Sequence, residues 1–189
     1  MESALIVSSS DKGNAFFSEA LKKAILLRVK IVGTCGEARR YLLEHQPDLV
    51  IVNAPLPDES GEQLAQEIAT QNDSMVILVT RFEIFDAVTA IVAPTGVLTV
   101  AKPIDGAVFW SALKLAESAQ ARIRRVLDEN VKLLKRIEDI RIVDKAKYLL
   151  IANLKLSEQE AHRYIEKRAM DTRLTRREIA EEILRAYEN

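Results

Sequence analysis

The chain of 189 residues contains a single cysteine, Cys35. One thiol excludes an internal disulfide framework and is typical of a reducing compartment, so the sequence predicts a cytoplasmic location. Long hydrophobic runs are also lacking, and no apolar segment approaches the roughly 20 residues that span a bilayer. The apolar run near the amino terminus is only Ala4–Val7 and follows the acidic Glu2, which does not fit a signal peptide.

The sequence also lacks an excess of charge of either sign. The 27 Lys and Arg residues balance 28 Asp and Glu residues, for a net charge of -1, so any affinity for nucleic acid must come from local clusters. His45 and His162 are isolated, and no group of Cys, His and carboxylates has the spacing of metal ligands. P-loop and G-x-S-x-G motifs are absent. The sequence therefore predicts no enzymatic activity, no metal and no cofactor.

Five short runs rich in Val, Ile and Leu alternate with helical patterns along the first 120 residues. They lack the apolar–polar alternation of a sheet with one wet face, so we expect a parallel sheet covered by helices on both faces. This pattern predicts a doubly wound α/β domain over residues 1–120, with its chemistry at the carboxyl ends of the strands. The predicted strands are Ala4–Ser8, Val29–Val32, Leu49–Asn53, Val76–Thr80 and Val97–Ala101.

The residues that end these strands resemble those of a response-regulator receiver domain, which has a flavodoxin-like fold. Asn53 and the following Ala-Pro-Leu-Pro stand at the phosphoacceptor loop, Thr80 ends the fourth strand, and Lys102 precedes a proline after the fifth. By this resemblance the acidic pair that holds Mg²⁺ corresponds to Ser8 and Ser9, and the Lys102–Pro103 peptide bond is a candidate for the cis form.

The acidic chemistry of a receiver is missing from these positions. An amide at Asn53 has no carboxylate to attack a phosphoryl donor, and the hydroxyls of Ser8 and Ser9 are poor ligands for Mg²⁺. We therefore predict a phosphorylation-incompetent receiver-like domain. Thr80 and Lys102 retain the residue types of the family, and we expect Lys102 to donate to Asn53 and to carbonyls at the strand ends.

One long helix or two nearly continuous helices are predicted after the receiver-like domain, because no Gly or Pro interrupts residues 107–156. From Phe109 through Ala112, Ala116 and Ala119, apolar positions alternate three and four apart, as in a coiled-coil seam. We expect a coiled-coil connector over residues 109–140 that pairs two copies in parallel, rather than a helix buried against its own chain. Asn130, at an a position of the heptad, favours a parallel coiled coil of two helices. The predicted dimer seam continues with Ile123, Val126, Asn130, Leu133, Ile137 and Ile140.

Residues 137–189 contain two capping boxes, each of which marks the start of a helix. Ser157 with Glu160 and Thr175 with Glu178 each place a hydroxyl three residues before a carboxylate, and apolar residues follow both at helical spacing. The pattern predicts a small all-α domain of three short helices that pack on one another.

Several separated elements of this region resemble the ANTAR domain, the RNA-binding module of bacterial transcription antiterminators. Tyr148 departs from the family pattern, which usually has Gly at that position. The matching elements are Arg141-Ile142, Lys145-Ala146-Lys147, Leu149-Leu150, Leu156-Ser157, Glu160-Ala161, Arg168-Ala169-Met170 and Ile179-Ala180-Glu181.

The resemblance implies a dimer that binds paired hairpins of a leader transcript and prevents terminator formation. It also implies, for one subclass, a ligand-sensing regulatory protein as a partner. Tyr148 either stacks on an RNA base or fills a gap in the packing. The RNA-binding residues that we predict are Arg141, Lys145, Lys147, Tyr148, Arg163, Lys167, Arg168, Arg173, Arg176 and Arg177. Nearby acids that could neutralise several of them are Glu138, Asp139, Asp144, Glu166, Glu181 and Glu182.

Two alternatives stay open. The first is a protein-interaction dimer or adaptor that has lost RNA binding, which the balanced charge and Tyr148 favour. The second is a DNA-binding regulator, because three small helices resemble a helix-turn-helix. The turn over residues 170–174 lacks the Gly that such turns often carry.

Overall fold

The computed structural model describes residues 1–24 and 28–187. It divides into two compact units, Met1–Ile123 and Arg124–Asn189. Among the described residues, no helix has both the length and the apolar content that crossing a membrane requires.

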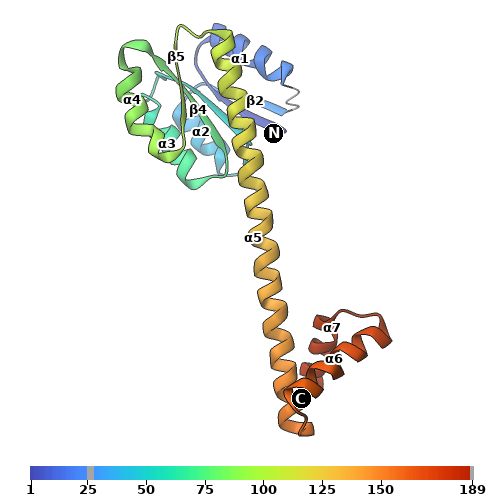
Figure 1. Cartoon of the computed structure of the whole chain (residues 1–189). Helices are drawn as coiled ribbons and strands as arrows, with labels where there is room; N and C mark the ends of the chain where they lie inside the picture. Colours follow the sequence, from blue (N-terminus) through green and yellow to red (C-terminus); the bar gives the residue numbers. More distant parts are fainter. Residues whose placement is uncertain (25–27, 188–189) are drawn as a thin grey trace. The chain divides into compact units, whose positions relative to one another are not determined.

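The first unit is built on a five-stranded parallel sheet in the order β2-β1-β3-β4-β5 (Figure 1). This is the predicted flavodoxin-like topology, and each predicted strand is confirmed to within one residue at its ends. The strands are β1 Ser3–Val7, β2 Arg28–Val32, β3 Leu49–Asn53, β4 Met75–Arg81 and β5 Leu98–Lys102.

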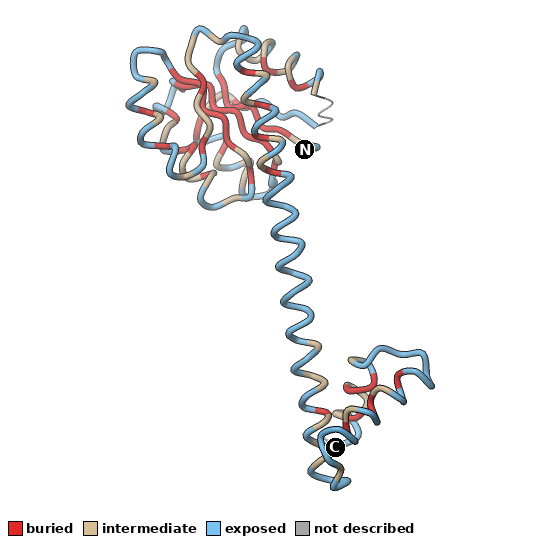
Figure 2. Tube along the Cα trace, in the orientation of Figure 1, coloured by how far each residue is buried: buried red, intermediate tan, exposed pale blue. Residues whose placement is uncertain are grey.

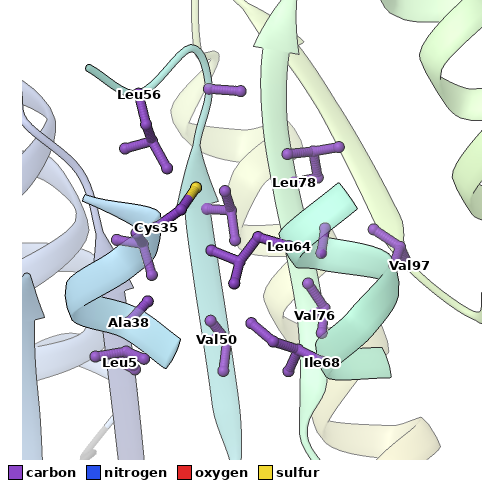
Figure 3. Packing of buried hydrophobic residues seen from close by; sticks show 14 of the residues in the cluster. Leu5, Cys35, Ala38, Val50, Leu56, Leu64, Ile68, Val76, Leu78 and Val97 are labelled. Atoms are coloured by element: carbon purple, nitrogen blue, oxygen red, sulfur yellow. The ribbon is translucent and has the colours of Figure 1, made fainter. Parts of the chain in front are cut away.

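Helices cover both faces of this sheet, which explains the apolar, non-alternating strands. On one face, the side chains of α2 (Cys35–Leu42), α3 (Glu62–Gln71) and α4 (Phe85–Val92) pack on alternate residues of the strands (Figure 3). On the other face, α1 (Asp11–Lys23) packs beside the first turns of α5. Two short 3₁₀ turns, Phe82–Ile84 and Ala93–Thr95, flank α4.

Helix α5 runs without interruption from Gly106 to Leu154, which confirms the predicted long helix. Within the first unit, Phe109 and Ala116 are fully buried against the chain's own sheet. Their assignment to a seam between two copies was therefore wrong. Apolar periodicity alone does not distinguish a residue that faces its own sheet from one that faces a partner.

The middle of α5 has the opposite character, because residues 121–138 are all exposed (Figure 2). Within each of the two units, this stretch of α5 is therefore not buried against other elements. The predicted seam residues are open on the described chain: Ile123 is 48% exposed and Leu133 is 52% exposed. Gln120 is the last buried residue before this stretch, and its Nε2 donates to the carbonyl oxygen of Asp48 over 3.1 Å.

The second unit packs α6 (Glu158–Thr172) and α7 (Arg176–Tyr187) with the end of α5. Both predicted capping boxes form: Ser157 and Glu160 exchange hydrogen bonds at the start of α6, and Thr175 and Glu178 do so before α7. Arg173 ends α6 in the left-handed conformation with φ 57°, so this turn forms without a glycine. The small core consists of Ala146, Leu150, Ala161, Ile165, Ala169, Ile179, Ala180 and Ile183.

Candidate functional site

The strand ends of the first unit bring together four of the five predicted receiver-site residues. Ser8 follows β1, Asn53 ends β3, Thr80 lies in β4 and Lys102 ends β5, so all four lie at the carboxyl edge of the sheet. Ser8 and Thr80 are each 1% exposed and Asn53 is 6% exposed. The fifth residue, Ser9, is exposed and lies outside this buried group.

Neutral hydrogen bonds occupy the place where a receiver holds its acidic residues. Asn53 Nδ2 donates to Ser8 Oγ over 2.9 Å, while Asn53 Oδ1 is buried and accepts no bond from the described residues. Lys102 Nζ donates to the carbonyl oxygen of Ala54, as predicted for a strand-end carbonyl, whereas no bond to Asn53 is formed. Burial, with a smaller contribution from Arg81, lowers the pKa of the Lys102 amine. The Lys102–Pro103 peptide bond is cis, as predicted.

The carboxylates of Asp58 and Glu59 hold the loop after Asn53 to α2. Asp58 accepts hydrogen bonds from the amides of Cys35 and Gly36, each over 3.0 Å, and these bonds lower the pKa of its carboxyl group. Glu59 pairs with Arg39, which also bonds Glu67 over 2.8 Å.

Cys35, Asp58 and Glu59 form the one cluster of potential metal ligands among the described residues. Burial, followed by the nearby Asp58, raises the pKa of the Cys35 thiol to about 11. A protonated thiol beside two engaged carboxylates is a poor metal site, because metals bind the thiolate.

In the second unit, ion pairs divide the ten predicted RNA-binding residues into two groups. Lys147 bonds Asp144 over 2.8 Å and Glu158 over 3.0 Å, so it joins α5 to the start of α6 and its pKa is raised. Arg177 bonds Asp139 over 2.6 Å, which joins α7 to α5, and also bonds Glu181 over 2.8 Å. These two side chains are only 16% and 36% exposed, and they stabilise the packing of the three helices.

Three further cations are paired at the surface. Arg168 bonds Glu182 over 3.2 Å, Arg176 bonds Glu166 over 3.2 Å, and Arg141 lies 4.0 Å from Glu138. Each of the six acids predicted as possible neutralisers is thus engaged with one of these cations or with Lys147 or Arg177.

The remaining candidates project from the surface of the second unit. Lys145, Arg163, Lys167 and Arg173 are exposed and form no ion pair within the described part of the chain. Tyr148 is 70% exposed, so the alternative that it fills a packing gap is not what the structure shows. Because Tyr148 follows Arg141 and Lys145 by seven and three residues, the three side chains share one face of α5.

A groove of about 1010 Å³ lies between the end of α5, α6 and α7. Ile140 and Val143 contribute apolar surface to it, and Lys135, Arg136 and Arg176 contribute positive charge. Lys135 and Arg136 were not among the predicted RNA-binding residues. The sequence does show two adjacent basic residues here, between the seam positions Leu133 and Ile137. They were not considered as an RNA contact because that segment was assigned to a coiled coil.

Comparison with known proteins assigns both parts of the chain. Residues 4–114 match the response regulator receiver domain, and residues 132–184 match the ANTAR domain. The transcriptional regulatory protein PdtaR of Mycobacterium tuberculosis (strain CDC 1551 / Oshkosh) is 31% identical over 158 residues, which cover 82% of this chain and 77% of PdtaR. PdtaR of strain ATCC 25618 / H37Rv matches to the same extent.

Solved structures support the fold of the first unit. The receiver domain of a putative Luxo repressor protein from Vibrio parahaemolyticus has a TM-score of 0.58 at 21% identity, covering 66% of this chain and 96% of that one. The receiver domain of an HD domain-containing protein from Pseudomonas fluorescens Pf-5 has a TM-score of 0.56 at 23% identity, covering 65% and 91%. At these identities the likeness shows a shared fold.

Proposed function

Because this chain belongs to the family of transcriptional regulators that join a response regulator receiver domain to an ANTAR domain, we propose that it is an RNA-binding transcription antiterminator. This family is regulatory and is not a class of enzymes. The observation that carries the proposal is one face of α5 in the second unit, where the open ring of Tyr148 lies beside the exposed Arg141 and beside Lys145, which forms no ion pair within the described residues. Cations and stacking aromatics of this kind bind RNA loops, whose bases are splayed out.

A dimer suits this function because the charge of one module is nearly balanced. A pair of modules raises the effective concentration of the second on a target with two hairpins, so weak single contacts become a stable complex. The exposed side chains of Ile123, Val126, Leu133 and Ile137, none of which lines the groove, support pairing through α5, since a single chain leaves this stripe in water. Holding both hairpins would prevent the competing terminator helix.

Control by a route other than aspartyl phosphate is the second part of the proposal. The amide of Asn53 is not a nucleophile for a phosphoryl donor, and the neighbouring Ser8 has no carboxylate to bind Mg²⁺. The input would then come from a partner, for which a ligand-sensing regulatory protein is the family precedent, acting in the cytoplasm.

A salt-titrated binding assay tests the proposal. The full chain is titrated with a leader RNA of two short hairpins, with an unstructured RNA of equal length and with duplex DNA. We expect preference for the two hairpins and a linear fall of log affinity with log salt. Preference for duplex DNA would replace antitermination with DNA binding. No binding to any of the three would favour a protein-interaction dimer, which the many ion pairs of Lys147, Arg168, Arg176 and Arg177 would suit.

A further inference from the structure

The groove between α5, α6 and α7 carries an excess of positive charge that its own acids do not neutralise. Its four carboxylates are all engaged within the second unit. Asp139 and Glu181 bond Arg177, and Asp144 bonds Lys147. Glu178 accepts from the amide and the hydroxyl of Thr175, each over 2.7 Å.

The cations left over are on the side of α5. Lys135 and Arg136 line the groove, are exposed, and form no ion pair within the described residues. Across the groove, Arg176 shares the single carboxylate of Glu166 with His162, at 3.2 and 3.3 Å.

Apolar surface lies beside these cations. Ile140 is 60% exposed and Val143 is half-buried, and both line the groove. A cavity that combines free cations with an apolar patch suits a ligand that has anionic groups at intervals and flat apolar faces between them. Single-stranded or looped RNA has this composition.

We propose that this groove is a second RNA contact, in which Lys135 and Arg136 bind backbone phosphates and Ile140 and Val143 contact an unpaired base or ribose. The inference rests on the proposed RNA-binding function and adds a site to it. A helix turns by about 100° per residue, so Lys145 lies on the side of α5 opposite Arg136. Arg141, Lys145 and Tyr148 do not line the groove, so the groove is distinct from the surface around Lys145 and Tyr148.

The test compares charge-matched pairs of substitutions in the full chain. Lys135→Gln with Arg136→Gln removes the two groove cations that form no ion pair within the described residues. Arg122→Gln with Arg125→Gln removes two exposed cations of the same helix that do not line the groove. Helix content and sedimentation are measured for both, so that loss of fold or of self-association is seen separately. The ligand is the two-hairpin leader RNA, titrated at several salt concentrations.

We expect the Lys135→Gln, Arg136→Gln variant to bind RNA about tenfold more weakly than the wild type. The slope of log affinity against log salt should fall by about one for each phosphate contact that is lost. The control pair should change affinity less than about twofold, because exposed charges outside a site are largely screened. An equal loss in both pairs, or no loss in either, would overturn the groove while leaving RNA binding by the wild type intact. A wild type that binds none of the RNAs would instead refute the proposed function, and the groove with it.

Discussion

Helix α1 passes directly over the amide of Asn53 at Gly13. A Cβ at Gly13 would lie 2.7 Å from Asn53 Nδ2, closer than Cβ atoms approach other heavy atoms in proteins, and 3.3 Å from Ser8 Oγ, which is a tight contact. The start of α1 thus packs a residue without a side chain against the amide of Asn53. The closeness of these two residues leads to a prediction about stability.

We expect Gly13→Ala to destabilise the first unit by about 1–3 kcal/mol, as for an overpacked core position. Urea unfolding gives the free energy, and the double variant Gly13→Ala with Asn53→Ala removes the amide that the methyl group meets. The double variant should recover part of the loss attributed to Gly13→Ala. Strict additivity of the two single effects would show that the contact does not constrain α1.

A second prediction concerns phosphorylation. Asn53→Asp restores the nucleophile, but the residues that would bind Mg²⁺ remain Ser8 and Ser9, so incubation with acetyl phosphate and Mg²⁺ should leave the variant unlabelled. Intact-mass measurement checks this. The triple variant Ser8→Asp, Ser9→Asp, Asn53→Asp serves as the positive control. Labelling of Asn53→Asp alone would show that the hydroxyls suffice and that the lack of a carboxylate at position 53 is the only barrier.

The sequence predicted the sheet well because a strand buried on both faces consists of consecutive apolar residues, as in Leu49–Asn53. The capping boxes were equally local, since Ser157 and Glu160 are three residues apart. Ion pairs between residues far apart in the sequence could not be predicted in this way. That Arg177 bonds Asp139 depends on how α7 packs on α5, and nothing in the order of residues separates it from a solvent-exposed arginine such as Arg173.

The burial of the predicted seam residues also could not be predicted from the sequence pattern. Phe109 and Ile123 have the same heptad position, yet Phe109 is fully buried and Ile123 is 48% exposed. The difference arises because the first turns of α5 pack on the sheet and the following turns do not, which is a property of the fold and not of the period.

The ion pairs predict that two neighbouring lysines differ in role. Lys147→Gln should lower the free energy of unfolding by about 0.5–1 kcal/mol, a modest amount because its partners Asp144 and Glu158 are exposed. Lys145→Gln breaks no ion pair of the described structure and should leave stability within about 0.5 kcal/mol, while weakening RNA binding more than Lys147→Gln does. Urea unfolding and RNA titration of both variants measure the two effects. The reverse order of RNA affinities would contradict this division.

Self-association through α5 gives a further prediction. Ile137 is 48% exposed at a predicted seam position, and Ile137→Glu would set two like charges against each other in a parallel pair. We expect sedimentation equilibrium to show dimerisation weakened by about tenfold or more. Leu43→Glu is the matched control, because Leu43 is 85% exposed and lies at the end of α2. A wild type that stays monomeric at micromolar concentration would remove the seam, whereas equal dimerisation of all three proteins would place the interface elsewhere.

Tyr148 carries the last prediction, since it is the position at which this chain departs from the family pattern. A side chain that is 70% exposed contributes little to packing, so Tyr148→Ala should change the free energy of unfolding by less than about 0.5 kcal/mol. If the ring stacks on a loop base, the same variant should lose about 1–3 kcal/mol of RNA binding, which is roughly 5- to 150-fold in affinity. Tyr148→Phe keeps the stacking face and should bind RNA nearly as well as the wild type, which separates stacking from a hydrogen bond of the hydroxyl group. Unchanged affinity in Tyr148→Ala would eliminate stacking and leave Arg141 and Lys145 as the contacts of that face.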